Sequence, residues 1–246
     1  MTTSSGSAGP GLYLGPRLDL AQLSSEFSNR GHVVIPRFLD DAFAARLYER
    51  LLSWSEWALV TRIQGEHRTF DAAGMDALDP ARRAAFDELV AAEARNGFQY
   101  LYERYPLFDH GRAGRLTDPV LAEAFAMLGH DSFLDFAREV TGVPQIRLAD
   151  GQVTRYRRGH FLTLHDDHAE EMQRVAAYVL NLTPEWAADF GGQLQFADAQ
   201  GRVQSVVTPS FNTLTVFAVP SPHLVSSVAP FVDRGRYAIT GWFRTG

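Results

Sequence analysis

The chain contains no cysteine, no apolar run long enough to span a bilayer and no excess of basic residues. Without cysteine, disulfides and thiolate ligands are excluded, so any metal site must use histidine and carboxylate side chains. The missing apolar run predicts that the protein has no membrane-spanning helix and no membrane partner. The net charge of −6 argues against a general nucleic-acid surface and would suit a basic partner.

The first 15 residues also lack the features of a targeting signal. They are rich in serine, glycine and threonine and contain neither a basic nor an apolar segment. This composition predicts a flexible tail at residues 1–15 rather than a signal peptide, and a cytoplasmic protein. With 46% hydrophobic residues in the chain, residues 16–246 are expected to form a single domain with a sizeable core.

Helix signals are concentrated in the first part of this domain, at about residues 16–144. Several aspartates stand where an N-cap is expected, and two of them precede a proline, which favours the first helical position. Glycines close two of the segments as C-caps. These signals predict helices at about residues 40–54, 79–95, 118–129 and 131–142.

From residue 145 the apolar residues follow the spacing of strands. Runs occur at about residues 146–156, 160–167, 173–182, 192–197, 202–207, 211–219, 223–229 and 235–244. Eight short strands separated by turns indicate a double-sheet jelly roll. The predicted fold is therefore α+β, a double-stranded β-helix core at about 145–246 with the N-terminal helices packed on one sheet.

Histidine and carboxylate side chains occur in the pattern His165-x-Asp167, followed later in the chain by His223. His165 ends an apolar run, so strand alternation would place it on the same face as Asp167, and His223 stands at a turn-to-strand junction. Two imidazoles and one carboxylate are the ligands of the facial triad that holds non-heme Fe(II) and leaves coordination positions open. A lone His-x-Asp is common in structural turns, so the prediction depends on the order and strand placement of all three.

A cation follows in the last predicted strand. Arg236 opens the otherwise apolar run 237–242, where an unpaired positive charge is costly. A dicarboxylic co-substrate can chelate iron at one end and pair with a guanidinium at the other. A salt bridge to a carboxylate in the core is the structural alternative.

With these motifs the chain resembles the prolyl-hydroxylase branch of the Fe(II)/2-oxoglutarate dioxygenases. The similarity covers roughly residues 30–244, is strongest after 150, and is carried by residues 31–39, 156, 165–167, 177–182, 186, 191–194, 221–223 and 236–242. Within the branch, the His-Asp-Asp run, a strand ending in Leu-x-Leu, and then Trp and Gly-Gly are most similar to one group. That group hydroxylates a proline of the small-ribosomal-subunit decoding-centre protein.

The resemblance implies Fe(II), 2-oxoglutarate and O2, with ascorbate in support, and release of succinate and CO2. It implies a protein or peptide substrate that contains proline, with a ribosomal protein as the narrower form. Where relatives commonly have tyrosine, this chain has Asn181, and a second family tyrosine is replaced by Phe161 or Leu162. The implied site residues are His165, Asp167 and His223 as metal ligands, Arg236 as a catalytic and co-substrate-binding residue, Tyr156 and Asn181 as co-substrate contacts, and Trp242 on the substrate side.

For several other segments and residues the sequence allows two interpretations. The aromatic stretch 98–105 is expected either to pack between helices and sheet or to form a wall facing the substrate. Segments 62–68 and 167–173 are candidate lid or peptide-contact elements, with solvated loops as the alternative. His160 and His168 flank the triad and are expected not to bind the metal. Candidates for an apolar lining, against ordinary core, are Val179, Leu194, Val225 and Trp242.

The predicted function is hydroxylation of a prolyl residue in a protein. Hydroxylation of free proline or another small molecule is one alternative, and a non-catalytic jelly-roll binding module is another. The intact triad together with Arg236 favours an enzyme, because a degenerate copy usually loses a ligand. Attack at the 3-carbon and at the 4-carbon of proline both stay open.

Overall fold

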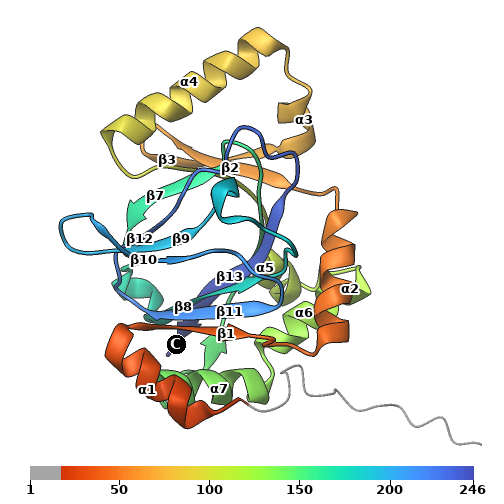
Figure 1. Cartoon of the computed structure of the whole chain (residues 1–246). Helices are drawn as coiled ribbons and strands as arrows, with labels where there is room; N and C mark the ends of the chain where they lie inside the picture. Colours follow the sequence, from red (N-terminus) through yellow and green to blue (C-terminus); the bar gives the residue numbers. More distant parts are fainter. Residues whose placement is uncertain (1–17) are drawn as a thin grey trace, which may run out of the picture.

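The second part of the chain forms the predicted strands, and these make up most of a nearly closed antiparallel barrel (Figure 1). The computed structural model describes residues 18–246, so the tail predicted at residues 1–15 lies outside the described residues. The strands after residue 145 are β5 (Leu148–Ala149), β6 (Gln152–Tyr156), β7 (Phe161–His165), β8 (Arg174–Asn181), β9 (Leu194–Ala197), β10 (Val203–Val207), β11 (Thr213–Ala218), β12 (His223–Val225) and β13 (Arg236–Arg244). The jelly-roll prediction is therefore confirmed.

The strand run predicted at 146–156 is divided in two at Asp150. The carbonyl oxygen of Asp150 accepts a hydrogen bond from the Tyr178 hydroxyl, and its carboxylate accepts one from the backbone N–H of Trp242. Since this carbonyl and side chain both bond to neighbouring strands, the backbone leaves the regular ladder there. Two short 3₁₀ turns also occur, η1 (Glu170–Met172) and η2 (Ala188–Phe190).

The predicted helices are present as α2 (Asp41–Leu52), α4 (Pro80–Asn96), α6 (Pro119–Leu128) and α7 (Asp131–Thr141). The side chains of Asp40, Asp79 and Asp118 cap the first three as expected, whereas His130 rather than Asp131 caps α7. The described residues also include α1 (Leu20–Arg30), α3 (Ala72–Asp76) and α5 (Leu107–Arg112).

The expectation that residues 16–144 are mainly helical was incomplete, because this part also supplies strands. They are β1 (His32–Pro36), β2 (Ala58–Ile63), β3 (Glu66–Asp71) and β4 (Tyr100–Tyr105). In β4 the side chains alternate between half-buried and buried positions, which is the period of a strand. The aromatic residues of 98–105 also alternate with a period of two. Because they stand between helix signals, the sequence did not predict a strand there.

Strand β4 joins the two sheets of the barrel. The strands follow the order β1-β11-β8-β13-β6-β4-β7-β12-β9-β10, and all pairings are antiparallel. One sheet consists of β1, β11, β8, β13 and β6, and the other consists of β7, β12, β9 and β10. The hairpin β2–β3 extends from the free edge of β4.

Helices α1, α2, α6 and α7 lie against the sheet that contains β1, β11, β8 and β13, whereas α3 and α4 accompany the hairpin β2–β3 at the opposite end of the molecule (Figure 1). The main core lies between that sheet and the first group of helices, so the predicted packing of helices on one sheet is confirmed. Its largest fully buried side chains include Phe38, Leu47, Leu121, Phe133 and Phe243. Of the helices in residues 18–246, none has the length and apolar character needed to cross a bilayer.

Candidate active site

A cavity of about 410 Å³ opens between the two sheets of the barrel. Its lining comes from β6, β7, β8, β12 and β13 and also from the hairpin β2–β3 and strand β4, so both parts of the chain contribute to it. The cavity contains the predicted metal ligands, Arg236 and Trp242.

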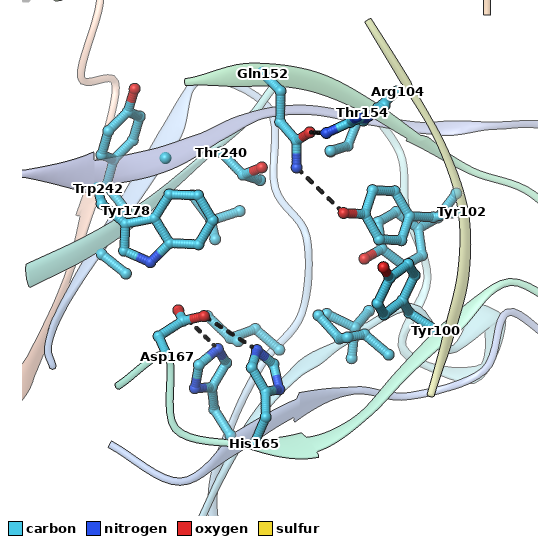
Figure 2. A pocket seen from close by; sticks show the side chains of 18 of the residues that line it. Tyr100, Tyr102, Arg104, Gln152, Thr154, His165, Asp167, Tyr178, Thr240 and Trp242 are labelled. Atoms are coloured by element: carbon cyan, nitrogen blue, oxygen red, sulfur yellow. Dashed lines mark hydrogen bonds and ion pairs between the residues drawn. The ribbon is translucent and has the colours of Figure 1, made fainter. Parts of the chain in front are cut away.

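His165, Asp167 and His223 meet on one side of this cavity. The Nε2 atom of His165 lies 3.4 Å from Oδ1 of Asp167, and Nε2 of His223 lies 3.5 Å from Oδ2 of the same carboxylate (Figure 2). One donor atom from each residue lies within 4.8 Å of the others. Two imidazole nitrogens and a carboxylate at this separation form a donor set suited to a divalent transition metal.

The two histidines are placed by strand pairing, because His165 on β7 stands opposite His223 on β12 in the ladder. Asp167 reaches the cluster differently. Strand β7 ends at His165, and Asp167 has a φ of 62°, in the left-handed region. Aspartate is one of the few residues that adopt this conformation readily. The prediction that strand alternation orients Asp167 was therefore wrong in its cause: a turn of the backbone directs this carboxylate into the cavity.

Each imidazole is oriented by a backbone carbonyl. Nδ1 of His165 lies 3.0 Å from the carbonyl oxygen of Thr163, and Nδ1 of His223 lies 2.8 Å from that of Ser221. A proton on Nδ1 satisfies these carbonyls and leaves the Nε2 lone pairs directed at the cluster. Burial and the nearby charge of His165 lower the pKa of His223 to about 4, so it is neutral and able to bind a metal at physiological pH.

The Asp167 carboxylate is ionised in this setting. Burial alone would raise its pKa, but the neighbouring imidazoles of His165 and His223 outweigh burial, and the pKa is lowered. The indole N–H of Trp242 lies near enough to help lower the pKa of this carboxylate, although the buried indole nitrogen makes no regular hydrogen bond.

Arg236, at the start of β13, is a buried cation. Only 2% of its surface is exposed, its guanidinium donates to Oδ1 of Asn181 at 3.0 Å, and its Nε has no partner. Among residues 18–246 it forms no ion pair, so the predicted structural alternative of a salt bridge in the core is not observed. Burial lowers its pKa to about 10, which leaves it charged at neutral pH. A buried guanidinium without a carboxylate calls for an anionic ligand.

Comparison with known proteins agrees with this geometry. Residues 151–244 match the 2OG-Fe(II) oxygenase superfamily. This part of the chain is therefore similar to 2OG-Fe(II) oxygenase domains. This family implies Fe(II), 2-oxoglutarate and O2, and the donor set, the buried Arg236 and the unpartnered Nε of Arg236 fit the metal and a dicarboxylate. The matched segment includes all the strands from β6 to β13.

Curated relatives and solved structures extend the comparison. The prolyl 3-hydroxylases OGFOD1 of Mus musculus and Xenopus laevis are 32% and 31% identical over 127 and 126 residues, which are 49% and 47% of this chain. The chain spans about a quarter of the length of these relatives, 23% and 24%. A Pseudomonas putida prolyl-4-hydroxylase has a TM-score of 0.57 at 20% identity, covering 92% of this chain and 98% of that one. A Trichoplax adhaerens prolyl hydroxylase in complex with a peptide fragment from the oxygen degradation domain of hypoxia inducible factor has a TM-score of 0.61 at 16% identity, covering 92% and 89%.

The other predicted site residues lie near Arg236. Tyr156 lines the cavity, stands opposite Arg236 in the β6–β13 ladder, and has the guanidinium carbon 5.3 Å from its ring centroid. Asn181 is buried and contacts Arg236, but it is not part of the cavity lining. The structure therefore places Asn181 behind the arginine rather than in the cavity. Trp242 lines the cavity and stacks on the guanidinium of Arg174 at 3.7 Å.

The opposite wall of the cavity consists of aromatic residues of 98–105, for which the sequence allowed either packing or a wall. Phe98, Tyr100 and Tyr102 line the cavity, and Figure 2 shows the two tyrosines across it from Asp167. The ring of Tyr102 stacks on that of Tyr156 with centroids 5.2 Å apart. Phe98 also lies 5.2 Å from the ring of His165. The alternate residues of β4 are buried on its other face. The interpretation of this stretch as a wall facing the cavity therefore fits the structure, and its period of two was the available signal.

A buried glutamine ties this wall to the strand that carries His165. The Gln99 side chain accepts from the backbone N–H of Arg62 at 2.9 Å and that of Tyr100 at 2.8 Å, and donates to the carbonyl oxygen of Arg62 at 2.9 Å. The backbone of Gln99 exchanges hydrogen bonds with Thr163, the residue whose carbonyl orients His165. This contact was not predicted, because it joins three distant segments of the chain.

The remaining predictions concern residues around the cluster. Val179, Leu194 and Val225 line the cavity, as expected of an apolar lining. His160 and His168 lie outside the donor cluster; the buried His160 instead accepts from the backbone N–H of Arg157 at 3.1 Å. Segment 62–68 forms the tip of the hairpin β2–β3, and His67 from it lines the cavity. Arg104, Gln152 and Thr154 also line it and were not predicted.

Proposed function

We propose that this protein is an Fe(II)- and 2-oxoglutarate-dependent dioxygenase that hydroxylates a prolyl residue of a protein, with release of succinate and CO2. The observation that carries the proposal is one cavity holding both a His-Asp-His donor cluster and a buried guanidinium without a carboxylate partner among the described residues. The named prolyl hydroxylases among the similar proteins support proline as the target. A ribosomal protein in the cytoplasm is the narrower form of the proposal.

In this proposal His165, Asp167 and His223 hold the iron, and Arg236 binds the distal carboxylate of 2-oxoglutarate. Asn181 fixes the direction of the Arg236 guanidinium from behind, and Tyr156 packs against it. Bound iron, 2-oxoglutarate and O2 supply the oxidising chemistry that inserts one oxygen atom into a C–H bond. We also propose that residues 16–246 act as one domain, since the cavity needs strands from both parts of the chain.

The side chains around the cluster control access and orientation. The carbonyls of Thr163 and Ser221 hold both imidazoles with Nε2 toward the metal position. The rings of Tyr100, Tyr102 and Trp242 enclose the space in front of it and limit the entry of water, which protects the reacting centre. A proline ring, which is apolar and compact, suits a space between aromatic faces.

Two measurements test the proposal. Succinate formation from 2-oxoglutarate with added Fe(II) and ascorbate reports the reaction class. Mass spectrometry of the host's ribosomal proteins, with and without this protein, should find a proline that gains the mass of one oxygen atom, and fragmentation of a synthetic standard assigns the 3- or 4-carbon. If free proline is hydroxylated and no protein is, the substrate is a small molecule and not a protein. Complete absence of 2-oxoglutarate turnover would favour a binding module instead.

A further inference from the structure

The cavity contains more positive charge than iron and 2-oxoglutarate explain. Apart from histidines and tyrosines, its ionisable lining residues are Arg104, Arg174 and Arg236, against the single carboxylate of Asp167. The two charges of Fe(II) and the two of 2-oxoglutarate cancel, so the occupied cavity keeps a positive excess. Positive excess in a confined space favours an additional anion.

Two of these arginines already have a role in the structure. Arg236 is directed by Asn181 and is assigned to the distal carboxylate of 2-oxoglutarate. Arg174 lies on the ring of Trp242 at 3.7 Å and donates to the backbone carbonyl of Asp167 at 3.4 Å. Burial lowers the pKa of Arg174, although the charges of Asp167 and Asp150 oppose this shift. The Nε of Arg174 is also buried without a partner, but the Trp242 ring holds its guanidinium, whereas Arg104 has no aromatic ring beneath it among the described residues. Arg104 is therefore the arginine whose charge is least accounted for.

Arg104 is held in place but poorly satisfied. Its guanidinium lies 3.4 Å from Oε1 of Gln152 and 3.4 Å from Nε2 of His67, both long for hydrogen bonds. Its Nε is buried without a partner, and among residues 18–246 it has no ion pair. His67 is itself fixed by the Tyr100 hydroxyl, 2.6 Å from Nδ1. A guanidinium offers five donors, and most of those of Arg104 are unused.

The position of Arg104 separates it from the 2-oxoglutarate site. Arg104 stands opposite Thr154 in the β4–β6 ladder, whereas Arg236 stands opposite Tyr156, two residues and about 7 Å along the same strand. From there its side chain extends toward Gln152, farther from Arg236. Figure 2 shows Arg104, Gln152 and Tyr102 across the cavity from Asp167 and His165. Since one carboxylate of 2-oxoglutarate chelates the metal and the other pairs with Arg236, neither is left for Arg104.

We propose that Arg104 binds a carboxylate of the substrate, placing the proline ring between the aromatic wall and the metal cluster. The inference rests on the proposed function and names its substrate class: a proline with a carboxylate close to the ring. That carboxylate belongs either to an acidic side chain beside the proline in a peptide or to a terminal or free proline. Guanidinium and carboxylate groups pair through two parallel hydrogen bonds, which would use the donors that Arg104 leaves free.

Binding without turnover tests this assignment directly. The protein is loaded with Mn(II) and 2-oxoglutarate without oxygen, and three pairs of probes are titrated by calorimetry. The pairs are a blocked peptide with Asp or Asn beside its proline, a peptide ending in proline as acid or amide, and free proline or its amide. In at least one pair the carboxylate form should bind roughly 10- to 100-fold more tightly, as expected for a charge-assisted hydrogen bond. The pair that discriminates identifies the source of the carboxylate.

Variants then assign the preference to Arg104. Arg104→Met should abolish the discrimination, and Arg104→Lys should retain part of it because the charge remains without the planar fork. The exposed Arg158, which lies outside the cavity, provides the matched control, and Arg158→Met should bind like the parent. The affinity for 2-oxoglutarate and the melting temperature should be the same in all four proteins, since Arg104 makes no contact with that site.

Three outcomes would overturn the proposal: no probe binds the parent, no pair is discriminated, or the preference survives in Arg104→Met. If Arg104→Met is unstable, two results still test the proposal. The parent protein must prefer the carboxylate probe, and Arg104→Lys must show a smaller preference. Failure of the proposed function is a separate result, in which carboxylate probes bind with the expected preference but the iron-loaded protein adds no oxygen to them or to any proline. Hydroxylation of proline without any carboxylate preference would retain the function and remove Arg104 from substrate recognition.

Discussion

Two regions of the molecule face each other across one cavity, and they differ in how they are built. Residues 151–244 supply the donor cluster, with its two histidines on the paired strands β7 and β12, and Arg236 on β13 in the other sheet. Residues before 145 supply the opposite wall, with Phe98, Tyr100 and Arg104 on or beside a strand that bridges the two sheets. The match to the oxygenase superfamily covers the first region and not the second. The donor cluster and Arg236 thus lie in the segment that matches the family, while the opposite wall of the cavity comes from residues outside that match.

The largest effect should come from a substitution in the donor cluster of residues 151–244. Asp167→Ala leaves two neutral imidazoles, so metal-dependent 2-oxoglutarate turnover should fall by more than the roughly 100-fold that loss of an outer-sphere partner costs. Metal affinity by calorimetry and succinate formation are the measurements. Asp166→Ala is the matched control, because this exposed neighbour lies outside the cluster. Full turnover in Asp167→Ala would show that the cluster is not the metal site.

Arg236 should affect the co-substrate and not the metal. Losing a buried charge pair costs about 2–5 kcal/mol, so Arg236→Met should raise the KM for 2-oxoglutarate roughly 30- to several-thousand-fold. Arg236→Lys should recover part of the affinity. Because Arg236 has no carboxylate partner among the described residues, methionine leaves no buried charge unpaired, and the melting temperature should change little. A lower melting temperature with an unchanged KM would assign Arg236 a structural role only.

Neighbouring residues on β4 distinguish the wall from the core behind it. Leu101 is buried on the far face, so Leu101→Ala should cost about 2–5 kcal/mol of stability and leave the substrate KM unchanged. Tyr100 lines the cavity, and Tyr100→Ala should instead raise the KM of a hydroxylated prolyl peptide up to roughly 10-fold, the value of an aromatic contact. Chemical unfolding and peptide kinetics on both variants check this. Equal effects on both properties would mean that β4 has no separate substrate-facing side.

The smallest effect should come from the contact that links the two regions. Gln99→Leu removes the acceptor for the N–H groups of Arg62 and Tyr100, which should cost about 1–3 kcal/mol. If the glutamine fixes the wall relative to β7, the peptide KM should also rise a few-fold while metal affinity stays the same. The exposed Gln204 offers a surface comparison, as Gln204→Leu should change neither. A change in metal affinity would show that the link acts on His165 instead of the wall.

The sequence was informative where local signals and tertiary structure agree. The aspartate N-caps located α2, α4 and α6, because a cap depends on residues within one turn of the chain. The strands after residue 145 were located by alternation and turns. The hairpin β2–β3 and strand β4 were not predicted, because their alternation is short and interrupted by helix signals. Only pairing with other strands makes them part of the sheet.

The same division applies to the site. Residue type, order and predicted strand placement singled out His165, Asp167, His223 and Arg236, because two imidazoles and a carboxylate on strand-like segments, with a lone cation in an apolar strand, are an unusual combination. Tertiary structure alone decided that a left-handed turn directs Asp167 into the cavity, that Asn181 lies behind Arg236, and that Arg104 faces the same cavity without an ion-pair partner among the described residues. The physical reason is distance along the chain: ligand chemistry is carried by individual side chains, whereas a charge balance within a cavity exists only once remote strands have paired.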